Sequence, residues 1–195
     1  IALVTRNRPE SLRRCLKSWR RQAVQPFEIV ISDDSDDFFR PEVESIAIEF
    51  KARWTTGPRR GLYANRNHVA LQCRGTHVFS ADDDHEHPID FIEKCLTALN
   101  QDSESAWCLG EVLSWDEVSR GWGVPGELKI VGAPDLPKNL SNTWAWSDGA
   151  TICPRRVFDS GLMFSEVFRF GWAYLEFGCL LHAVGLRIRI LEGTG

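Results

Sequence analysis

The chain has 195 residues, a formal net charge of −4 at pH 7 and 43% hydrophobic residues, which is an ordinary globular composition. The slight acidic excess argues against nucleic acid as the main partner, because nucleic-acid-binding domains are usually basic. No apolar run reaches the length of about 18 residues that a membrane-spanning helix needs. We expect a single domain over residues 1–195. Because the sequence opens on IALV without an initiator Met, we expect it to be a fragment of a longer chain.

The first half of the chain alternates short apolar segments with amphipathic ones. The pattern predicts helices at residues 9–22, 41–51, 61–74 and 88–100, and strands at residues 1–4, 27–32, 52–56 and 77–80. In the first helix, Leu12, Cys15, Leu16 and Trp19 follow the spacing of one helical face. Alternating strands and helices of this length predict an α/β domain with a mostly parallel central sheet flanked by helices.

The second half follows a different pattern. Strands are predicted at residues 106–115 and 127–131, and residues 144–156 are predicted as a strand leading into a turn. A helix over residues 173–185 ends at a glycine, and residues 186–191 form a last strand. The six cysteines show neither a C-x-x-C pair nor a Cys/His spacing suited to zinc, so we predict reduced core thiols of a cytosolic protein.

Two acidic clusters follow predicted strands. DDSDD occupies residues 33–37, and DDD occupies residues 82–84. In a parallel sheet both clusters would lie at the carboxyl edge, where ligands bind. Adjacent carboxylates repel one another, and a hard divalent cation relieves that repulsion. The sequence therefore predicts metal-assisted phosphate binding, with helix capping and turn formation as the alternative.

Several kinds of phosphate chemistry are disfavoured by missing motifs. The chain has no G-x-x-x-x-G-K-[ST] loop and no G-x-G-x-x-G after the first strand. A D-x-D-x-[TV] phosphatase motif is also absent, because the first predicted strand continues into TRNRPES. A nucleotide-diphosphate site fits better, with one acidic loop for the base and ribose and the other for a metal on the diphosphate.

The acidic motifs and their surroundings resemble family 2 glycosyltransferases of the GT-A fold. The resemblance rests on LVTRNRPESLRRCLKSWRRQ, FEIVISDDSDD and GLYANRNHVALQCRGTHVFSADDDHEHP. It implies a nucleotide-sugar donor, usually a UDP-sugar, and a Mn²⁺ or Mg²⁺ ion. It also implies a Rossmann-like nucleotide-sugar-binding half over residues 1–100 and an acceptor-side half over residues 101–195.

The resemblance assigns roles to individual residues of the nucleotide half. Thr5 matches a nucleoside-contacting position, and Asp34 matches the aspartate that accepts a hydrogen bond from the base. Asp33 is its neighbour in the nucleotide site, with a structural role. Arg66 is a candidate for contact with the diphosphate, and a surface ion pair is the alternative.

The DDD triplet resembles the D-x-D motif of the same family. Asp84 is the expected metal ligand, and Asp82 or Asp83 is expected to face the ribose and diphosphate, with Asp82 also a candidate metal ligand. His85 and His87 follow directly, and we expect solvated loop positions for both, with metal ligation as the alternative.

The acceptor-side half matches the family less closely. When the chain is aligned on LEFG, the family's Glu-Asp pair falls on Ala173 and Tyr174, and the Asp of that pair is the family's general base. A tyrosine with an ordinary pKa near 10 is a poor base. Asp148 and Glu176 are therefore the two candidate catalytic residues, with Glu166 a weaker third. A tryptophan of this half could also stack on an acceptor sugar, although core packing explains most of them.

The resemblance thus implies a metal-dependent glycosyltransferase that moves a sugar, with inversion, from a nucleotide diphosphate (UDP is expected) to a hydroxyl or amine acceptor such as a carbohydrate. The first alternative is a non-catalytic sugar-nucleotide-binding module that has lost its base. The second is a nucleotidyltransferase, which TRNRPES disfavours because it is not a Gly-rich, Lys-containing loop. We expect a location in the cytoplasm or at the cytoplasmic face of a membrane. Peripheral membrane contact would involve parts outside this chain.

Overall fold

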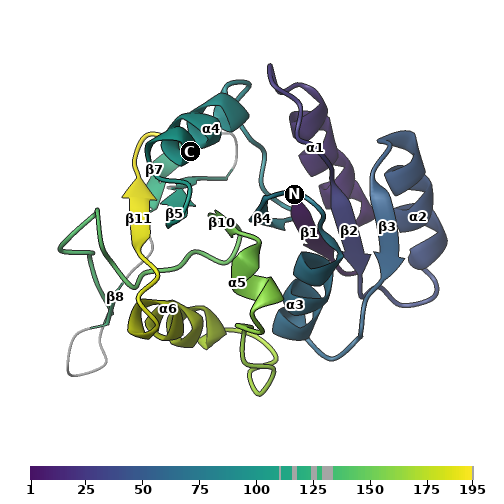
Figure 1. The fold of residues 1–195 in the computed structure, drawn as a ribbon. Helices are drawn as coiled ribbons and strands as arrows, with labels where there is room; N and C mark the ends of the chain where they lie inside the picture. The colour runs from purple at the N-terminus through teal and green to yellow at the C-terminus, as the bar shows by residue number, and fades with distance from the viewer. Residues whose placement is uncertain (110, 116–117, 124–126, 129–133, 195) are drawn as a thin grey trace.

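A computed structural model describes residues 1–109, 111–115, 118–123, 127–128 and 134–194. Within these residues the main sheet has seven strands in the order β11-β5-β10-β4-β1-β2-β3 (Figure 1). Their bounds are β1 Ala2–Thr5, β2 Val30–Asp33, β3 Arg53–Thr56, β4 His77–Asp82, β5 Ala106–Leu109, β10 Ala150–Pro154 and β11 Ile188–Leu191. Strands β3, β2, β1 and β4 are parallel, β11 is parallel to β5, and only β10 runs antiparallel to both of its neighbours. The predicted mostly parallel sheet is confirmed.

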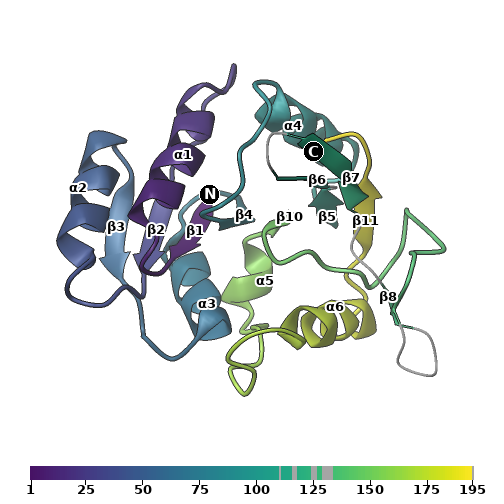
Figure 2. The same cartoon turned by 180° about the vertical axis from the view of Figure 1, so that it is seen from behind.

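Helices cover both faces of this sheet (Figure 1 and Figure 2). They are α1 Pro9–Arg20, α2 Arg40–Glu49, α3 Leu62–Gln72, α4 Phe91–Gln101, α5 Arg156–Asp159 and α6 Ala173–Ala183. One core cluster joins the sheet to α1, α2 and α4, and a second joins it to α3, α5 and α6. In β1, Leu3 belongs to the first cluster while Ala2 and Val4 belong to the second, because side chains alternate between the two faces of a strand.

The second half departs from the predicted elements. Residues 106–115 do not form one strand, since β5 joins the main sheet while β6 (Glu111–Trp115) pairs with β7 (Val118–Gly123) in a separate ribbon. The apolar residues of this stretch predict extended structure, but they do not show where the chain leaves one sheet and pairs in another. Strand β10 covers only five residues of the predicted 144–156. Of the predicted strand at 127–131, β8 (Glu127–Leu128) pairs with β9 (Pro134–Asp135), and the remainder lies outside the described residues.

The cysteines follow the prediction with one exception. All six lie among the described residues, none of them forms a disulfide, and five are buried. Cys179 on α6 is exposed, so the prediction of a core thiol is wrong there. The helix turns the preceding Gly178 inward instead, where an added Cβ would lie 2.0 Å from the Trp144 carbonyl oxygen.

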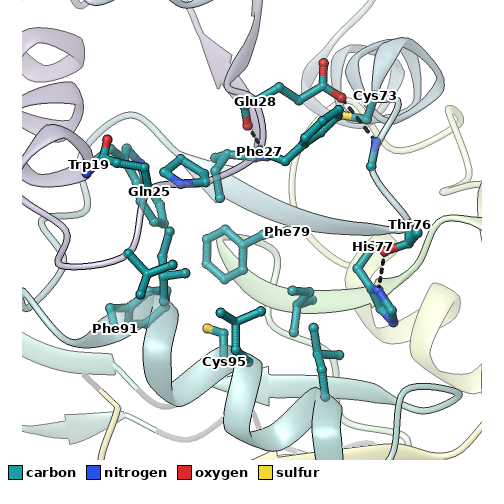
Figure 3. Close-up of a pocket in the computed structure, with 18 residues that line it drawn as sticks. Trp19, Gln25, Phe27, Glu28, Cys73, Thr76, His77, Phe79, Phe91 and Cys95 are labelled. Carbon is teal, nitrogen blue, oxygen red and sulfur yellow. Dashed lines mark hydrogen bonds between the residues drawn. The ribbon is translucent and has the colours of Figure 1, made fainter.

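An apolar cavity of about 230 Å³ lies at the amino edge of the sheet (Figure 3). Ile1 and His77, at the amino ends of β1 and β4, line it together with Trp19, Phe79 and Phe91. The acidic clusters follow the carboxyl ends of the strands, so this cavity lies at the opposite end of the sheet from them. Separately, no helix among the described residues is long and apolar enough to cross a membrane.

Candidate functional site

The acidic triplet lies where β4 ends. Asp82, Asp84 and His85 each present one potential ligand atom, and these atoms lie within 4.8 Å of one another. Two carboxylates and an imidazole are a donor set that suits Mn²⁺ and is compatible with Mg²⁺. The residues therefore fit the divalent ion that the sequence predicts. His85 is partly covered, because its Nδ1 lies 3.3 Å from the Gly149 carbonyl oxygen, so a fully solvated position is the wrong description of this ring.

Asp83 lies on the other side of the triplet and is fully buried. Thr5 Oγ1 donates a 2.6 Å hydrogen bond to its Oδ2, and Arg8 Nη2 lies 2.5 Å from its Oδ1. Burial raises the pKa of the Asp83 carboxyl to about 6, in spite of the opposing effects of Thr5 and Arg8. The Thr5 hydroxyl and the Asp83 carboxylate, both predicted for the nucleotide, thus hold the ends of β1 and β4 together.

Arg8 is a member of this site that the sequence interpretation missed. Its Nη1 donates a 2.8 Å hydrogen bond to Asp84 Oδ2, so its guanidinium joins Asp83 and Asp84. Its position could have indicated it, because Arg8 is a basic residue between the first strand and Pro9, which begins α1. Its partner lies 76 positions further along the chain, which local spacing does not reveal.

Arg66 lies on α3 with its side chain 2% exposed. Its Nη2 lies 2.6 Å from Asp82 Oδ1, and its Nη1 donates to Ser80 Oγ at 3.0 Å. The structure shows the ion pair of the alternative prediction, but the Arg66 side chain is buried, so the predicted surface location is wrong. Because the guanidinium is held by two residues of β4, it fixes the Asp82 carboxylate at the edge of the acidic cluster.

Asp33 and Asp34 occupy different environments at the end of β2. Asp33 is fully buried and accepts hydrogen bonds from the Ser35 backbone N–H at 2.8 Å and Trp54 Nε1 at 3.3 Å. This agrees with the structural role expected of it. Asp34 Oδ1 accepts from the Arg59 backbone N–H at 2.8 Å, and burial raises the pKa of this carboxyl.

Gly57 shows how closely the chain approaches Asp34. A Cβ added at Gly57 would lie 2.2 Å from Asp34 Oδ1 and 2.5 Å from Asn65 Oδ1. A side chain at this position would therefore push the loop after β3 away from the carboxylate. Because residue 57 has no side chain, the backbone after β3 can pack directly against the Asp34 carboxylate.

Asp148 belongs to the same neighbourhood as Asp82. Its Oδ2 accepts a 2.9 Å hydrogen bond from the Tyr63 hydroxyl, and its carbonyl oxygen accepts from Ser80 Oγ at 2.5 Å. Burial, reinforced by the negative charge of Asp148, raises the pKa of Tyr63 above its usual value. An added Cβ at the next residue, Gly149, would lie 2.3 Å from Asp82 Oδ2. The Asp148-Gly149 turn therefore packs directly against the acidic cluster.

The remaining candidate bases form no hydrogen bond or ion pair with the acidic triplet in the parts of the chain that the structure describes. Glu176 is exposed on α6, and within the described part of the chain no hydrogen bond or ion pair links it to the acidic triplet. Tyr174, at the position of the family's base, packs partly buried against the core beside α3, α5 and α6. Glu166 lies 2.9 Å from Arg60, in an ion pair, and not simply free in solvent. The structure thus brings Asp148 to the cluster, whereas no interaction among the described residues links Glu176 to it.

His87 is a further difference from the sequence prediction. Its ring lies 4.0 Å from the Trp19 ring and 4.3 Å from the Phe91 ring, centroid to centroid. Burial lowers the pKa of His87 to about 3. This histidine is a neutral packing residue, because the loop after β4 turns back toward the apolar core between His85 and Phe91.

The loop between α5 and α6 is anchored on α3. Asn67 donates from Nδ2 to the Phe164 carbonyl oxygen at 2.9 Å and accepts from the Phe164 N–H at 3.0 Å. The Leu62 N–H donates to the Arg169 carbonyl oxygen at 2.9 Å. Beyond these anchors, Phe170 is 83% and Trp172 62% exposed. The Trp172 side chain is therefore more accessible than those of Trp107, Trp144 and Trp146.

Solved structures with this architecture are GT-A glycosyltransferases. The crystal structure of S. aureus TarS superposes with a TM-score of 0.73 at 20% identity, over 99% of this chain and 35% of that one. TarS 1-349 in complex with UDP-GlcNAc gives 0.74 at 19% identity, over 99% and 55%. GalNAc-T7 with UDP, GalNAc and Mn²⁺ gives 0.77 at 15% identity, over 97% and 40%. The protein therefore has the GT-A fold. It spans between 35% and 55% of the length of these three chains.

The family follows from the sequence match. Residues 1–154 match Glycosyl transferase family 2, which is well over half of the 195 residues. The chain belongs to glycosyl transferase family 2. No curated protein matches it significantly.

Proposed function

We propose that this protein transfers a sugar from a UDP-sugar to a hydroxyl or amine acceptor, with inversion and with the help of a divalent metal ion. The observation that carries the proposal is the set of ligand atoms from Asp82, Asp84 and His85 at the carboxyl edge of the sheet. The complexes of TarS with UDP-GlcNAc and of GalNAc-T7 with UDP and Mn²⁺ support this choice of donor and metal.

The donor would occupy the carboxyl edge of β1, β2 and β4, contributed by residues 1–100. Asp34 would accept the imide N–H of uracil through the oxygen that Arg59 does not use. Asp84, Asp82 and His85 would hold Mn²⁺ or Mg²⁺, which as a Lewis acid stabilises the charge of a leaving diphosphate. Arg66 would orient the metal ligand Asp82 and would not itself contact the diphosphate, because its guanidinium is already held by that carboxylate and Ser80.

Residues 101–195 would supply the acceptor side, and Asp148 is the better of the two candidate bases. A base must lie within hydrogen-bond reach of the acceptor proton while that acceptor faces the donor. Asp148 lies beside the acidic cluster, and the Tyr63 hydroxyl orients its carboxylate. Glu176 remains the second candidate, since its exposed carboxylate has no such orienting partner among the described residues.

Calorimetric titration with UDP, with and without Mn²⁺, tests the donor and metal assignments together. The wild type should bind UDP measurably more tightly with Mn²⁺, and Asp84→Ala should remove that metal dependence. Glu86→Ala is the matched control, because Glu86 is an acid two residues away that pairs with Arg14 and Arg21 at the surface. Equal UDP affinity and equal response to EDTA in Asp84→Ala and wild type would contradict the assignment.

A second candidate function is a sugar-nucleotide-binding module without turnover. Ala173 and Tyr174 favour it, because they stand where the family carries its Glu-Asp pair. Donor hydrolysis and transfer should be assayed in wild type, Asp148→Asn, Glu176→Gln and the double variant Ala173→Glu/Tyr174→Asp. An inactive wild type that gains turnover in the double variant would establish the module. An active wild type that Asp148→Asn slows at least about tenfold would identify the base.

A further inference from the structure

The Arg8 guanidinium lies inside the candidate metal site and holds a carboxylate that belongs to it. It contacts Asp84 Oδ2 at 2.8 Å and Asp83 Oδ1 at 2.5 Å. The side chains of Arg8 and Asp84 are 50% and 47% exposed. This pair is therefore at the boundary with solvent, where a long side chain can change rotamer.

The backbone beneath Arg8 is fixed, in contrast to its side chain. Asn7 adopts a left-handed conformation with φ 56°. Its N–H donates to Ser35 Oγ at 2.8 Å, and its side chain exchanges two 2.8 Å hydrogen bonds with Asp36. The Arg8 carbonyl oxygen accepts from the Leu12 N–H in the first turn of α1. The backbone thus holds Arg8 at a set distance from the acidic triplet, while its side chain is half-exposed.

Each carboxylate of the ligand cluster already has a cationic partner. Asp82 pairs with Arg66 at 2.6 Å, and Asp84 pairs with Arg8. The other oxygen of Asp84 lies 3.8 Å from His85 Nε2. A divalent ion among these ligand atoms would be repelled by both guanidinium groups. Arg66 is buried and cannot withdraw, whereas half-exposed Arg8 can.

We propose that Arg8 is a movable counter-ion of the metal site. In the nucleotide-free protein it neutralises Asp84 and weakens metal binding. When a divalent ion and a nucleoside diphosphate bind together, Arg8 leaves Asp84 and donates to the diphosphate, a group whose oxygens match the guanidinium fork. This inference rests on the proposed function, and it makes the binding of metal and nucleotide mutually dependent.

The first experiment needs no nucleotide. Free Mn²⁺ is measured by electron paramagnetic resonance during titration of wild type, Arg8→Ala, Arg8→Lys and Arg14→Ala. Arg8→Ala should raise the Mn²⁺ affinity about tenfold, because it removes a positive charge a few ångströms from a divalent ion. Arg8→Lys keeps the charge and should stay near wild type. Arg14→Ala is the control, because it removes the same charge from α1, the helix that follows Arg8, and Arg14 pairs only loosely with Glu86, at 3.9 Å.

The second experiment measures UDP affinity by calorimetry at saturating Mn²⁺. Arg8→Ala should bind UDP about tenfold more weakly, because charge-assisted hydrogen bonds to the diphosphate are lost. The factor by which UDP enhances Mn²⁺ binding should shrink by about tenfold in the same variant, as linkage requires. Circular dichroism melts of each variant establish that the chains compared are folded.

The outcomes separate this inference from the proposed function. Unchanged or weaker Mn²⁺ binding by nucleotide-free Arg8→Ala would overturn the inference, because Arg8 would then orient Asp84 and not compete for it. Absence of Mn²⁺ binding in both wild type and Arg8→Ala would overturn it as well. Failure of wild type to bind UDP would overturn the proposed function, while the nucleotide-free Mn²⁺ titration would still decide the effect of Arg8.

Discussion

The two edges of the central sheet are stabilised by opposite kinds of interaction. At the carboxyl edge, carboxylates at the ends of β2 and β4 are held by guanidinium, hydroxyl and backbone N–H groups from other elements. At the amino edge, aromatic and aliphatic side chains surround an apolar cavity (Figure 3). The stability of the polar edge therefore depends on individual partners, because a buried charge that loses its partner is costly. The stability of the apolar edge depends instead on how well the side chains pack.

Removal of Arg66 is the largest expected disturbance of the polar edge. Arg66→Ala leaves Asp82 without its cation and should lower the free energy of unfolding by about 3 kcal/mol, as breaking a buried ion pair does. Urea denaturation measures the change. The double variant Arg66→Met/Asp82→Leu should recover most of the loss. Arg13→Ala is the control, because it breaks a more accessible ion pair, the one with Glu49. A loss below about 1 kcal/mol in Arg66→Ala would show that the pair contributes little.

A smaller effect is expected at Asp34, on ligand affinity and not on folding. Asp34→Ala removes one charged hydrogen-bond acceptor and should weaken UDP binding by about 1.5–3 kcal/mol, or roughly ten- to a hundredfold. Calorimetry in Mn²⁺ measures it. Asp37→Ala is the matched control from the same acidic cluster, because its side chain is 83% exposed. An affinity of Asp34→Ala equal to that of the control would remove Asp34 from the nucleotide site.

The smallest effect concerns His87, which faces the aromatic residues near the apolar edge. Its pKa is lowered from 6.5 to about 3 in the folded protein, so the folded state resists protonation more than the unfolded state does. Its stabilising contribution is therefore full above pH 6.5 and is lost as the pH falls toward 3. Wild type should lose about 1 kcal/mol more than His87→Phe between about pH 7 and pH 5, after allowance for partial exposure.

Thermal and urea unfolding at several pH values measure the His87 effect. His182→Gln is the control, because it removes a histidine that is exposed on α6. Parallel pH profiles for wild type and His87→Phe would mean that the folded protein accommodates the charged ring.

The sequence by itself determined the elements of the first half and their broad arrangement. Apolar spacings such as Leu12, Cys15, Leu16 and Trp19 on α1 are local, and burial of one helix face follows directly from them. Because parallel strands place their carboxyl ends at one edge, the sequence also located Asp34 and Asp82–Asp84 at the same edge. The residue types and their order were enough for this, since no distant contact had to be known.

Only the tertiary structure decided which side chains meet at that edge. Strand β10 inserts antiparallel beside β4 with Ala150 opposite Ala81, which places Asp148 and Gly149 against Asp82. Tyr63 reaches Asp148 across 85 positions of sequence, and Arg8 reaches Asp84 across 76. Periodicity reports the face on which a residue lies, but not the strand order or the direction of a long side chain. For that physical reason the sequence indicated a charged site, and the fold alone determined its pairings.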